Sequence, residues 1–203
     1  MEFDISDAEV VKKENCYNGF FKMDRYTVRH RLYDGSMSEE FTRELFERGH
    51  ASAVLLYDPV KDAVVMIEQF RIGALAAGMD PWLYEVVAGI NEPGEKPEDV
   101  VVRESLEEAG VSVENLRFVT RYLVSPGGTS ETLYLYVGTV DSSKAGGVHG
   151  LADEHENIRV HVVPFKEALS MADDGRICNA TALISIYYLA SHRDIFLEQV
   201  QVK

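Results

Sequence analysis

A group of charged residues between positions 95 and 108 has the types and spacing that a metal-dependent reaction needs. Glu104, Glu107 and Glu108 follow Arg103 closely, and Glu95 precedes them. On a helix, residues three and four apart share a face, so these glutamates would crowd together. Like charges at that spacing oppose helix formation unless a cation offsets them. Carboxylates gathered in this way suit a hard, oxygen-seeking divalent ion, with Mg2+ the first choice.

The same run carries the signals of a helix that could present these carboxylates. Pro97 suits a first turn, and Gly110 suits a left-handed C-terminal cap. Val102, Leu106 and Ala109 are expected on the opposite side of the helix, buried against a sheet. The sequence therefore predicts a helix with one acidic face and one apolar face.

Two interpretations of the acidic face are open at this point. Arg103 lies one turn before Glu107, so it can pair with that carboxylate and hold it in place for chemistry. Alternatively, the run is a solvated face of a surface helix, which is what most charge runs are.

The order of residues favours the first interpretation, because it resembles the Nudix box. The matching positions are Gly89, Glu95, Arg103, Glu104, Glu107, Glu108, Gly110 and Val111. Ser105 departs from the pattern, which has an aliphatic residue there. Many fixed positions at fixed spacing are a specific signal. The chain is identified as a member of the Nudix hydrolase family, whose reaction is hydrolysis at a diphosphate joined to another moiety.

Segments outside the box resemble the bacterial ADP-ribose pyrophosphatase branch of that family. They are Pro126, residues 46–50, residues 67–71 and residues 147–163. The resemblance implies Mg2+-dependent hydrolysis of ADP-ribose to AMP and ribose 5-phosphate. Two alternatives stay open: a pyrophosphatase for another nucleotide diphosphate sugar such as GDP-mannose, and a non-catalytic module that senses ADP-ribose. The retained box acids favour an enzyme over the sensing module.

The resemblance also implies roles for particular acids. Glu104, Glu108, Glu156 and the backbone carbonyl of Ala88 would hold two or three Mg2+ ions, for which Mn2+ can substitute. Such ions neutralise the charges of a diphosphate that repel an attacking water. Glu154, on the same late loop as Glu156, is the candidate general base. The alternative for both late glutamates is that they are ordinary loop acids.

Further acids and arginines are expected to support the metal ligands and to bind substrate. Glu95, Arg103 and Glu107 match supporting positions. The substrate-contact positions are Phe20, Phe21, Arg43, Arg71, Ile90, Ser125, Pro126, Gly127 and Glu131. The arginine fork suits phosphate oxygens. The two phenylalanines match a position at which a partner subunit supplies adenine contacts, with core packing as the alternative. For Glu131, a bond to a ribose hydroxyl and a secondary acid role are both open.

Composition limits the other classes of protein to which the chain could belong. The chain has 203 residues, of which 46% are hydrophobic and 27% charged, as in ordinary globular proteins. A formal net charge of −14 disfavours nucleic-acid binding. No apolar run is long enough for a membrane span. Cys16 and Cys178 are the only cysteines, and no signal-peptide core is evident, so a cytoplasmic location is expected.

The elements that must position these residues form a mixed α/β pattern. Strands are expected near residues 26–32, 41–46, 53–57, 64–71, 82–88, 116–124, 132–140 and 158–163, and later helices near 165–172 and 180–192. A flexible loop is expected over 141–150. The fold class is an α/β/α Nudix sandwich with a mixed sheet, formed by residues 51–203. Residues 1–50 would add a small antiparallel β element that is too small to stand alone, so it should pack on the main domain or on a second subunit. The resemblance, together with this element, implies a homodimer.

Overall fold

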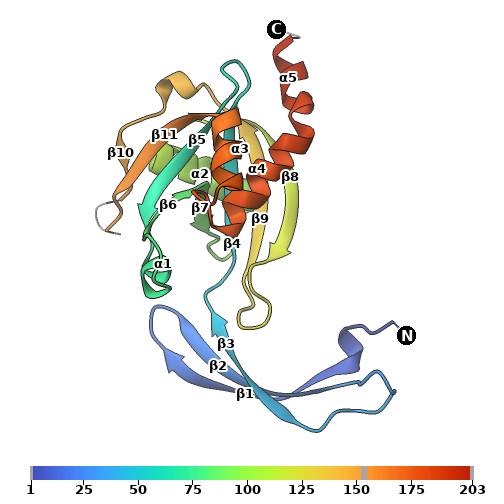
Figure 1. Cartoon of the computed structure of the whole chain (residues 1–203). Coiled ribbons are helices and arrows are strands. Elements are labelled where there is room, and N and C mark those ends of the chain that lie inside the picture. The colour runs from blue at the N-terminus through green and yellow to red at the C-terminus, as the bar shows by residue number, and fades with distance from the viewer. Residues whose placement is uncertain (1, 152–154, 202–203) are drawn as a thin grey trace. The chain divides into compact units, whose positions relative to one another are not determined.

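The computed structural model describes residues 2–151 and 155–201 of the chain. Within this range the chain divides into two compact units. The first contains the chain up to His50 together with Leu123–Thr132, and the second contains the rest. Figure 1 shows the elements of both units. The segment Leu123–Thr132 thus groups with the N-terminal residues although it lies far along the chain.

The first unit is built on an antiparallel sheet with the order β1-β2-β3. Its strands are β1 (Ala8–Asn18), β2 (Lys22–His30) and β3 (Phe41–Glu47), and a 3-10 turn, Ile5–Asp7, precedes them. The sequence pattern predicted the second and third strands. It missed β1, because every residue of that strand is exposed and its charged stretch shows no apolar alternation.

The second unit is built on a mixed sheet of eight strands. They are β4 (Ala51–Asp58), β5 (Ala63–Phe70), β6 (Trp82–Glu85), β7 (Val87–Ile90), β8 (Glu114–Leu123), β9 (Thr132–Thr139), β10 (Val148–His149) and β11 (Ile158–Pro164). The order is β10-β11-β5-β4-β9-β8, with β6 beside β5 and β7 beside β4. β4 runs parallel to β9 and antiparallel to β5 and β7.

Helices cover both faces of this sheet (Figure 1). They are α1 (Ile72–Ala76), α2 (Pro97–Ala109), α3 (Phe165–Asp173), α4 (Ala180–His192) and α5 (Asp194–Gln201), with a 3-10 turn at Ser142–Lys144. α3 and α4 lie on one face and α2 on the other. Among the described residues, no helix is long and apolar enough to cross a membrane.

The strand β4 explains why two layers of helices form. It is buried along its whole length, and its side chains point alternately to opposite faces. Leu55 and Tyr57 pack into a core with α3 and α4, whereas Val54 and Leu56 pack into a second core with α2. Strands buried on both faces need a layer on each side. The predicted α/β/α sandwich with a mixed sheet is therefore confirmed.

The strand expected at residues 82–88 is in fact two strands. The chain leaves β6 at Glu85 and enters β7 at Val87, and the two strands pair with different neighbours. This switch carries Ala88 and Gly89 to the strand that contacts α2. The short helix α1, between β5 and β6, was not predicted because it spans little more than one turn.

The expected flexible loop at 141–150 also contains regular structure. Ser142–Lys144 forms a 3-10 turn, and Val148–His149 forms β10, which pairs antiparallel with β11. Local composition predicted a loop because serine and glycine are frequent in it, but pairing with a distant strand orders its second half.

Candidate active site

The helix α2 begins and ends where the sequence predicts. Pro97 occupies the first turn, and Gly110 has φ 66°, the left-handed cap conformation. The Gly110 N–H donates to the Leu106 carbonyl at 3.1 Å, and the Val111 N–H donates to the Ser105 carbonyl at 3.1 Å. These bonds satisfy carbonyls that a helix end leaves free, so the position of the last turn is well defined.

The inward face of α2 differs from the expected one. Val102 and Leu106 are 40% and 51% exposed, so the prediction that they bury against the sheet was wrong. Ala109 is fully buried as predicted, but the stripe around it is formed by Val101, Ser105 and Glu108, spaced four and three residues apart. The Ser105 hydroxyl donates to the Val101 carbonyl at 2.6 Å, which satisfies the one polar group that the departure from the family pattern buries. Rotation of the helix toward this stripe brings a carboxylate into the core.

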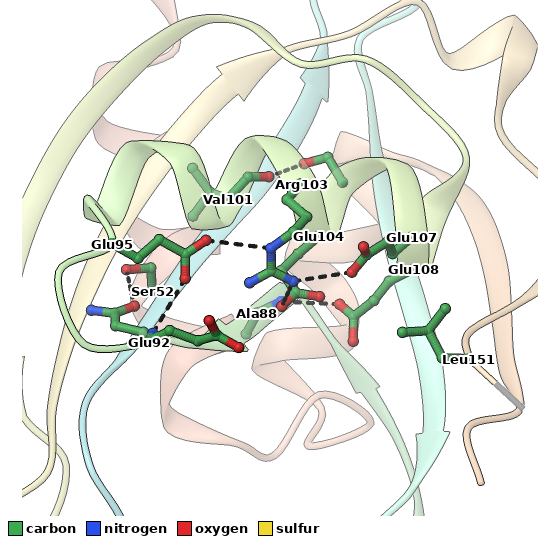
Figure 2. A network of polar contacts seen from close by, with 12 residues as sticks. Ser52, Ala88, Glu92, Glu95, Val101, Arg103, Glu104, Glu107, Glu108 and Leu151 are labelled. Carbon is green, nitrogen blue, oxygen red and sulfur yellow. Dashed lines mark hydrogen bonds and ion pairs between the residues drawn. The ribbon is translucent and has the colours of Figure 1, made fainter. Parts of the chain in front are cut away.

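Arg103 organises the acids around the start and middle of α2 (Figure 2). Its Nη1 contacts Glu104 Oε1 at 2.7 Å and Glu107 Oε2 at 3.0 Å, and its Nε contacts Glu95 Oε1 at 3.3 Å. Glu95 in turn accepts a hydrogen bond from the Glu92 N–H at 3.2 Å. The guanidinium thus holds one carboxylate from the loop and two from the helix in fixed positions, and the expected pairing of Arg103 with Glu107 is present.

Glu108 is the most buried acid of the cluster, with 2% of its surface exposed. Its pKa is raised to about 8, chiefly by burial and also by the charges of Glu104 and Glu156, against the opposing effects of the Ala88 N–H and Arg71. The Ala88 N–H donates to Glu108 Oε2 at 3.1 Å. Burial also raises the pKa of Glu104, although Arg103 counteracts this. The cluster therefore gathers more negative charge than its neighbours offset.

Gly89 allows the strand β7 to approach this cluster. A Cβ atom at Gly89 would lie 1.9 Å from Glu104 Oε1, which is far inside contact distance. Only glycine leaves room for that carboxylate beside the strand. The glycine of the box thus has a steric function, and it places the Ala88 backbone beside Glu108.

Glu156 lies at the far end of the late loop. Its backbone N–H donates to the Leu151 carbonyl at 3.1 Å, and its Oε2 accepts from the Leu151 N–H at 3.1 Å. The negative charge of Glu156 raises the pKa of both Glu104 and Glu108, so the three carboxylates lie close enough to interact. Glu154, the predicted general base, lies outside the described residues.

The cluster suits a hard cation, although its acids now bind other partners. Among residues 2–151 and 155–201, no group of three or more His, Cys, Asp or Glu residues is arranged to hold a metal ion. The oxygens of Glu104, Glu108 and Glu156 instead accept bonds from Arg103 and from backbone N–H groups. Carboxylate oxygens are nevertheless the ligands that Mg2+ prefers, and a buried carboxylate with a raised pKa would gain from a nearby cation.

Two of the predicted substrate positions lie in the second unit with the acids. Arg71 follows β5, and its Nε contacts Glu85 Oε2 at 2.7 Å. The positive charge of Arg71 acts to lower the pKa of Glu108, so its guanidinium interacts with the acidic cluster. Ile90 ends β7, pairs with Ala51 and is 43% exposed.

Three other substrate positions lie in the first unit, two of them in the turn between β1 and β2 and the third on β3. Phe20 is 89% exposed, and its ring contacts that of Phe21 with 4.7 Å between centroids. Phe21 also packs edge-on against Phe46, at 5.2 Å. The Arg43 guanidinium lies over the ring of Phe41, 4.6 Å from its centroid. The exposed ring of Phe20 argues against the core-packing alternative for that residue, whereas Phe21 has packing partners.

The turn after β8 also belongs to the first unit. Ser125 accepts hydrogen bonds at its carbonyl from Gly128 and Thr129, both at 3.0 Å, which makes a tight turn through Pro126 and Gly127. This turn is joined to β3, because the Phe46 N–H donates to the Gly128 carbonyl at 2.8 Å.

Arg48 is a site residue to which the sequence assigned no separate role. Its Nε lies 3.5 Å from Oε2 of Glu131, which is 6% exposed, and its guanidinium lies 5.3 Å from the centre of the Phe21 ring. It therefore links two predicted substrate positions that are far apart in sequence. The signal that could have found it is its place directly after β3, within residues 46–50, a segment already matched to the family.

A separate cavity of about 540 Å3 lies in the second unit, beside the end of α2 at Gly110 and Val111. Asp58, Lys61, Asn115 and Lys144 are among its lining residues, and none of the predicted catalytic, metal or substrate positions lines it. The acids on α2 therefore do not line this cavity.

Comparison with known proteins agrees with the arrangement on α2. The NUDIX domain model matches residues 47–182. The ADP-ribose pyrophosphatase of Escherichia coli strain K12 is 50% identical over 190 residues, which cover 94% of this chain and 91% of that protein. The ADP-ribose pyrophosphatase of Haemophilus influenzae is 45% identical, with 92% and 88% covered. The GDP-mannose pyrophosphatase of Klebsiella pneumoniae is 32% identical, with 90% and 91% covered.

Proposed function

Because the chain belongs to the NUDIX family, we propose that it is a hydrolase that cleaves ADP-ribose to AMP and ribose 5-phosphate. The observation that carries the reaction class is the buried carboxylate of Glu108 beside Glu104, where β7 meets α2. The observation that supports the substrate is 50% identity over nearly the whole chain to a curated ADP-ribose pyrophosphatase. Water adds to one phosphorus of the diphosphate, and the bond from that phosphorus to the bridging oxygen breaks.

Glu104, Glu108, Glu156 and the Ala88 carbonyl are the residues that we propose hold Mg2+. When bound, such ions neutralise the diphosphate and activate water toward the phosphorus. We propose that two or three ions bind there and that Mn2+ can replace Mg2+. Glu108 supports the assignment, because a cation would stabilise the ionised form that burial disfavours.

The remaining residues of the second unit would bind and orient. Arg103 keeps Glu104, Glu107 and Glu95 in position through the contacts described above. Arg71 supplies positive charge close to the acids, which suits a diphosphate oxygen. Glu154 is proposed to take the proton from the attacking water.

We propose that the first unit provides the nucleoside contacts and the dimer contacts. Phe20 and Phe21 would stack on adenine, Arg43 would reach the diphosphate, and Glu131 would bond a ribose hydroxyl or act as a secondary acid. Ser125, Pro126, Gly127 and the second unit's Ile90 would line the substrate.

The same proposal includes a homodimer, in which residues 1–50 form a dimerising β element and residues 51–203 form the Nudix domain. It also includes a cytoplasmic location. Nucleic acid and membranes are not expected partners.

A second candidate is hydrolysis of another nucleotide diphosphate sugar. The specific observation in its favour is the 32% identity to a GDP-mannose pyrophosphatase over 90% of the chain. The identity to ADP-ribose pyrophosphatases is higher at similar coverage, so ADP-ribose remains the preferred substrate.

The test is a comparison of kcat/KM for ADP-ribose, GDP-mannose and other nucleotide diphosphate sugars with Mg2+ present. We expect ADP-ribose to give the highest value and Glu108→Gln to lower it by about 100-fold or more, because a metal ligand would be lost. A preference for a guanine nucleotide would move the assignment to the second candidate. Hydrolysis of every substrate at parent rates by Glu108→Gln would reject the proposed site.

A further inference from the structure

We propose that His149 is a positioning residue that fixes the loop bearing Glu156 against the C-terminal end of α2. The inference rests on the proposed function, in which Glu156 belongs to the metal-binding acids. It concerns a histidine to which neither the sequence motifs nor the proposed mechanism assigns a role.

The first contact is between the His149 ring and Gly110. A Cβ atom at Gly110 would lie 2.5 Å from His149 Cε1 and 3.2 Å from each ring nitrogen. The ring is therefore packed directly on the Cα of the helix cap. Gly110 is needed for its left-handed φ of 66° and also because any side chain would displace this ring.

The second contact holds the ring to its own loop. His149 Nε2 lies 2.7 Å from the Gly146 carbonyl oxygen, so the ring nitrogen donates there. The ring thus bridges two segments: the cap of α2 on one side and the turn at Gly146 on the other. A half-buried ring with partners on both sides acts as a spacer of fixed size.

The backbone around His149 is anchored as well. His149 pairs with Ile158 at the start of β11, and Ile158 is fully buried. The Gly150 N–H donates to the Glu107 carbonyl in the last turn of α2, at 3.3 Å. The edge strand β10 is therefore joined to its neighbour β11 on one side and to the last turn of α2 on the other.

Gly150 and Leu151 connect the anchored His149 to Glu156. Gly150 has φ 100°, and a Cβ atom there would lie 2.6 Å from Glu156 Cβ. Leu151 is joined to Glu156 by the two hydrogen bonds already described. A shift of His149 would move Gly150 and Leu151, and with them the carboxylate. Figure 2 shows Leu151 on the side of Glu108.

The experiment compares His149→Ala and His149→Gln with the parent protein. Gln removes the ring from Gly110 but can keep a donor for the Gly146 carbonyl. His192→Ala is the matched control, because His192 also contacts a backbone carbonyl, Tyr188 O at 2.9 Å, but does so on α4. The two measurements are the Mg2+ concentration that half-saturates ADP-ribose hydrolysis, and hydrogen exchange of residues 145–151 in the metal-free protein.

For His149→Ala we expect the half-saturating Mg2+ concentration to rise by about 10-fold, since partners that orient metal ligands typically affect metal affinity by that order. KM for ADP-ribose should change less than twofold, and residues 145–151 should exchange faster. His149→Gln should give about a threefold rise. His192→Ala should match the parent in both measurements.

Parent-like Mg2+ dependence and exchange in His149→Ala would overturn the inference. If His149→Ala does not fold, His149→Gln decides in the same way: parent-like values overturn the inference, and shifted values support it. Glu108→Gln separates the two proposals. Loss of activity in Glu108→Gln with parent-like His149 variants rejects this inference alone, whereas full activity in Glu108→Gln rejects the proposed function and this inference with it.

Discussion

At the residue scale, the central feature is a carboxylate placed where its charge is unfavourable. Glu108 is buried, and its pKa of about 8 lies well above the ordinary 4.5. The folded protein therefore binds a proton more tightly at this group than the unfolded chain does. A cation bound beside Glu108 would favour the ionised carboxylate and lower this pKa, so metal binding would release a proton.

The first prediction concerns the stability of the metal-free protein. Because folding raises the pKa of Glu108, its contribution to stability is fully present below about 4.5 and is lost as the pH rises to about 8. Glutamine does not ionise, so Glu108→Gln should not lose stability over this pH range. The variant should melt above the parent at pH 8 and near it at pH 4.5. Thermal unfolding in a chelator at both pH values measures the difference. Glu114→Gln, an exposed glutamate of β8, is the control and should behave as the parent. Parent-like melting of Glu108→Gln at pH 8 would contradict the prediction.

A second prediction at this scale concerns Asp58, which is 2% exposed at the end of β4. Burial opposes its ionisation, but hydrogen bonds from the Ser142 hydroxyl at 2.6 Å and from backbone N–H groups outweigh burial and lower its pKa below 3.8. Its stabilising effect is therefore present above pH 3.8 and lost as the pH falls through the lowered value.

Asp58→Asn should reduce the free energy of unfolding at pH 7 by about 1–3 kcal/mol, because buried N–H and O–H donors lose a charged acceptor. The difference from the parent should shrink at pH 3. Urea unfolding at the two pH values measures it. Asp141→Asn, at an exposed acid of the neighbouring turn, is the control. An equal loss at both pH values would show that ionisation of Asp58 is not the cause.

At the element scale, the site depends on the approach of β7 to α2. The break between β6 and β7 turns the chain from β5 to β4, and this brings Gly89 under Glu104. The helix then contributes a stripe in which Val101 and Ser105 lie against the sheet and Glu108 follows them. The site is therefore a property of the strand–helix pair, and a change in the strand should disturb acids on the helix.

Gly89→Ala tests this dependence. The added methyl would meet Glu104 Oε1, so Glu104 or the strand must move, and we expect ADP-ribose hydrolysis to fall by about 100-fold through loss of ligand geometry. Gly73→Ala is the matched control, because a Cβ atom at Gly73 would have nothing within 4 Å, and it should leave the rate unchanged. Kinetics at saturating Mg2+ and a melting curve measure both variants. Parent-like activity of Gly89→Ala would show that the close approach is not required.

At the scale of the whole molecule, the predicted functional residues separate into two sets. The acids, Arg71 and Ile90 belong to the second unit, whereas the phenylalanines, Arg43, the Pro126 turn and Glu131 belong to the first. The resemblance implies that a partner subunit supplies adenine contacts, so the proposed dimer would build each site from both chains. The exposed ring of Phe20 is accessible to an external ligand.

Subunit mixing tests this proposal. Glu108→Gln and Arg43→Ala should each be nearly inactive as homodimers. After co-refolding in equal amounts, half of the dimers should be mixed, and one of the two sites in each should be free of both changes, which restores about one quarter of the parent activity. Activity assays with light scattering to confirm the dimer measure this. Activity no higher than the mean of the two variants would show that Arg43 and Glu108 of the same chain serve one site, and a monomer would reject the dimer itself.

The amino-acid sequence by itself determined the features that depend on local chemistry and spacing. Pro97 and Gly110 bounded the helix because backbone conformation at a helix end is a local property. Arg103 and Glu107 were paired correctly because residues four apart meet on any helix. The short apolar run at residues 53–57 indicated a buried strand, and the mixed pattern of elements indicated the sandwich.

Tertiary structure alone decided which face of the helix is buried and which distant segments meet. Of the three apolar residues expected to face the sheet, only Ala109 is buried, because the face that packs depends on the strand beneath the helix. The contact of His149 with Gly110, the pairing of Arg48 with Glu131, and the grouping of Leu123–Thr132 with the N-terminal sheet join residues far apart in sequence. No local pattern encodes such contacts, because they arise only when the whole sheet has assembled.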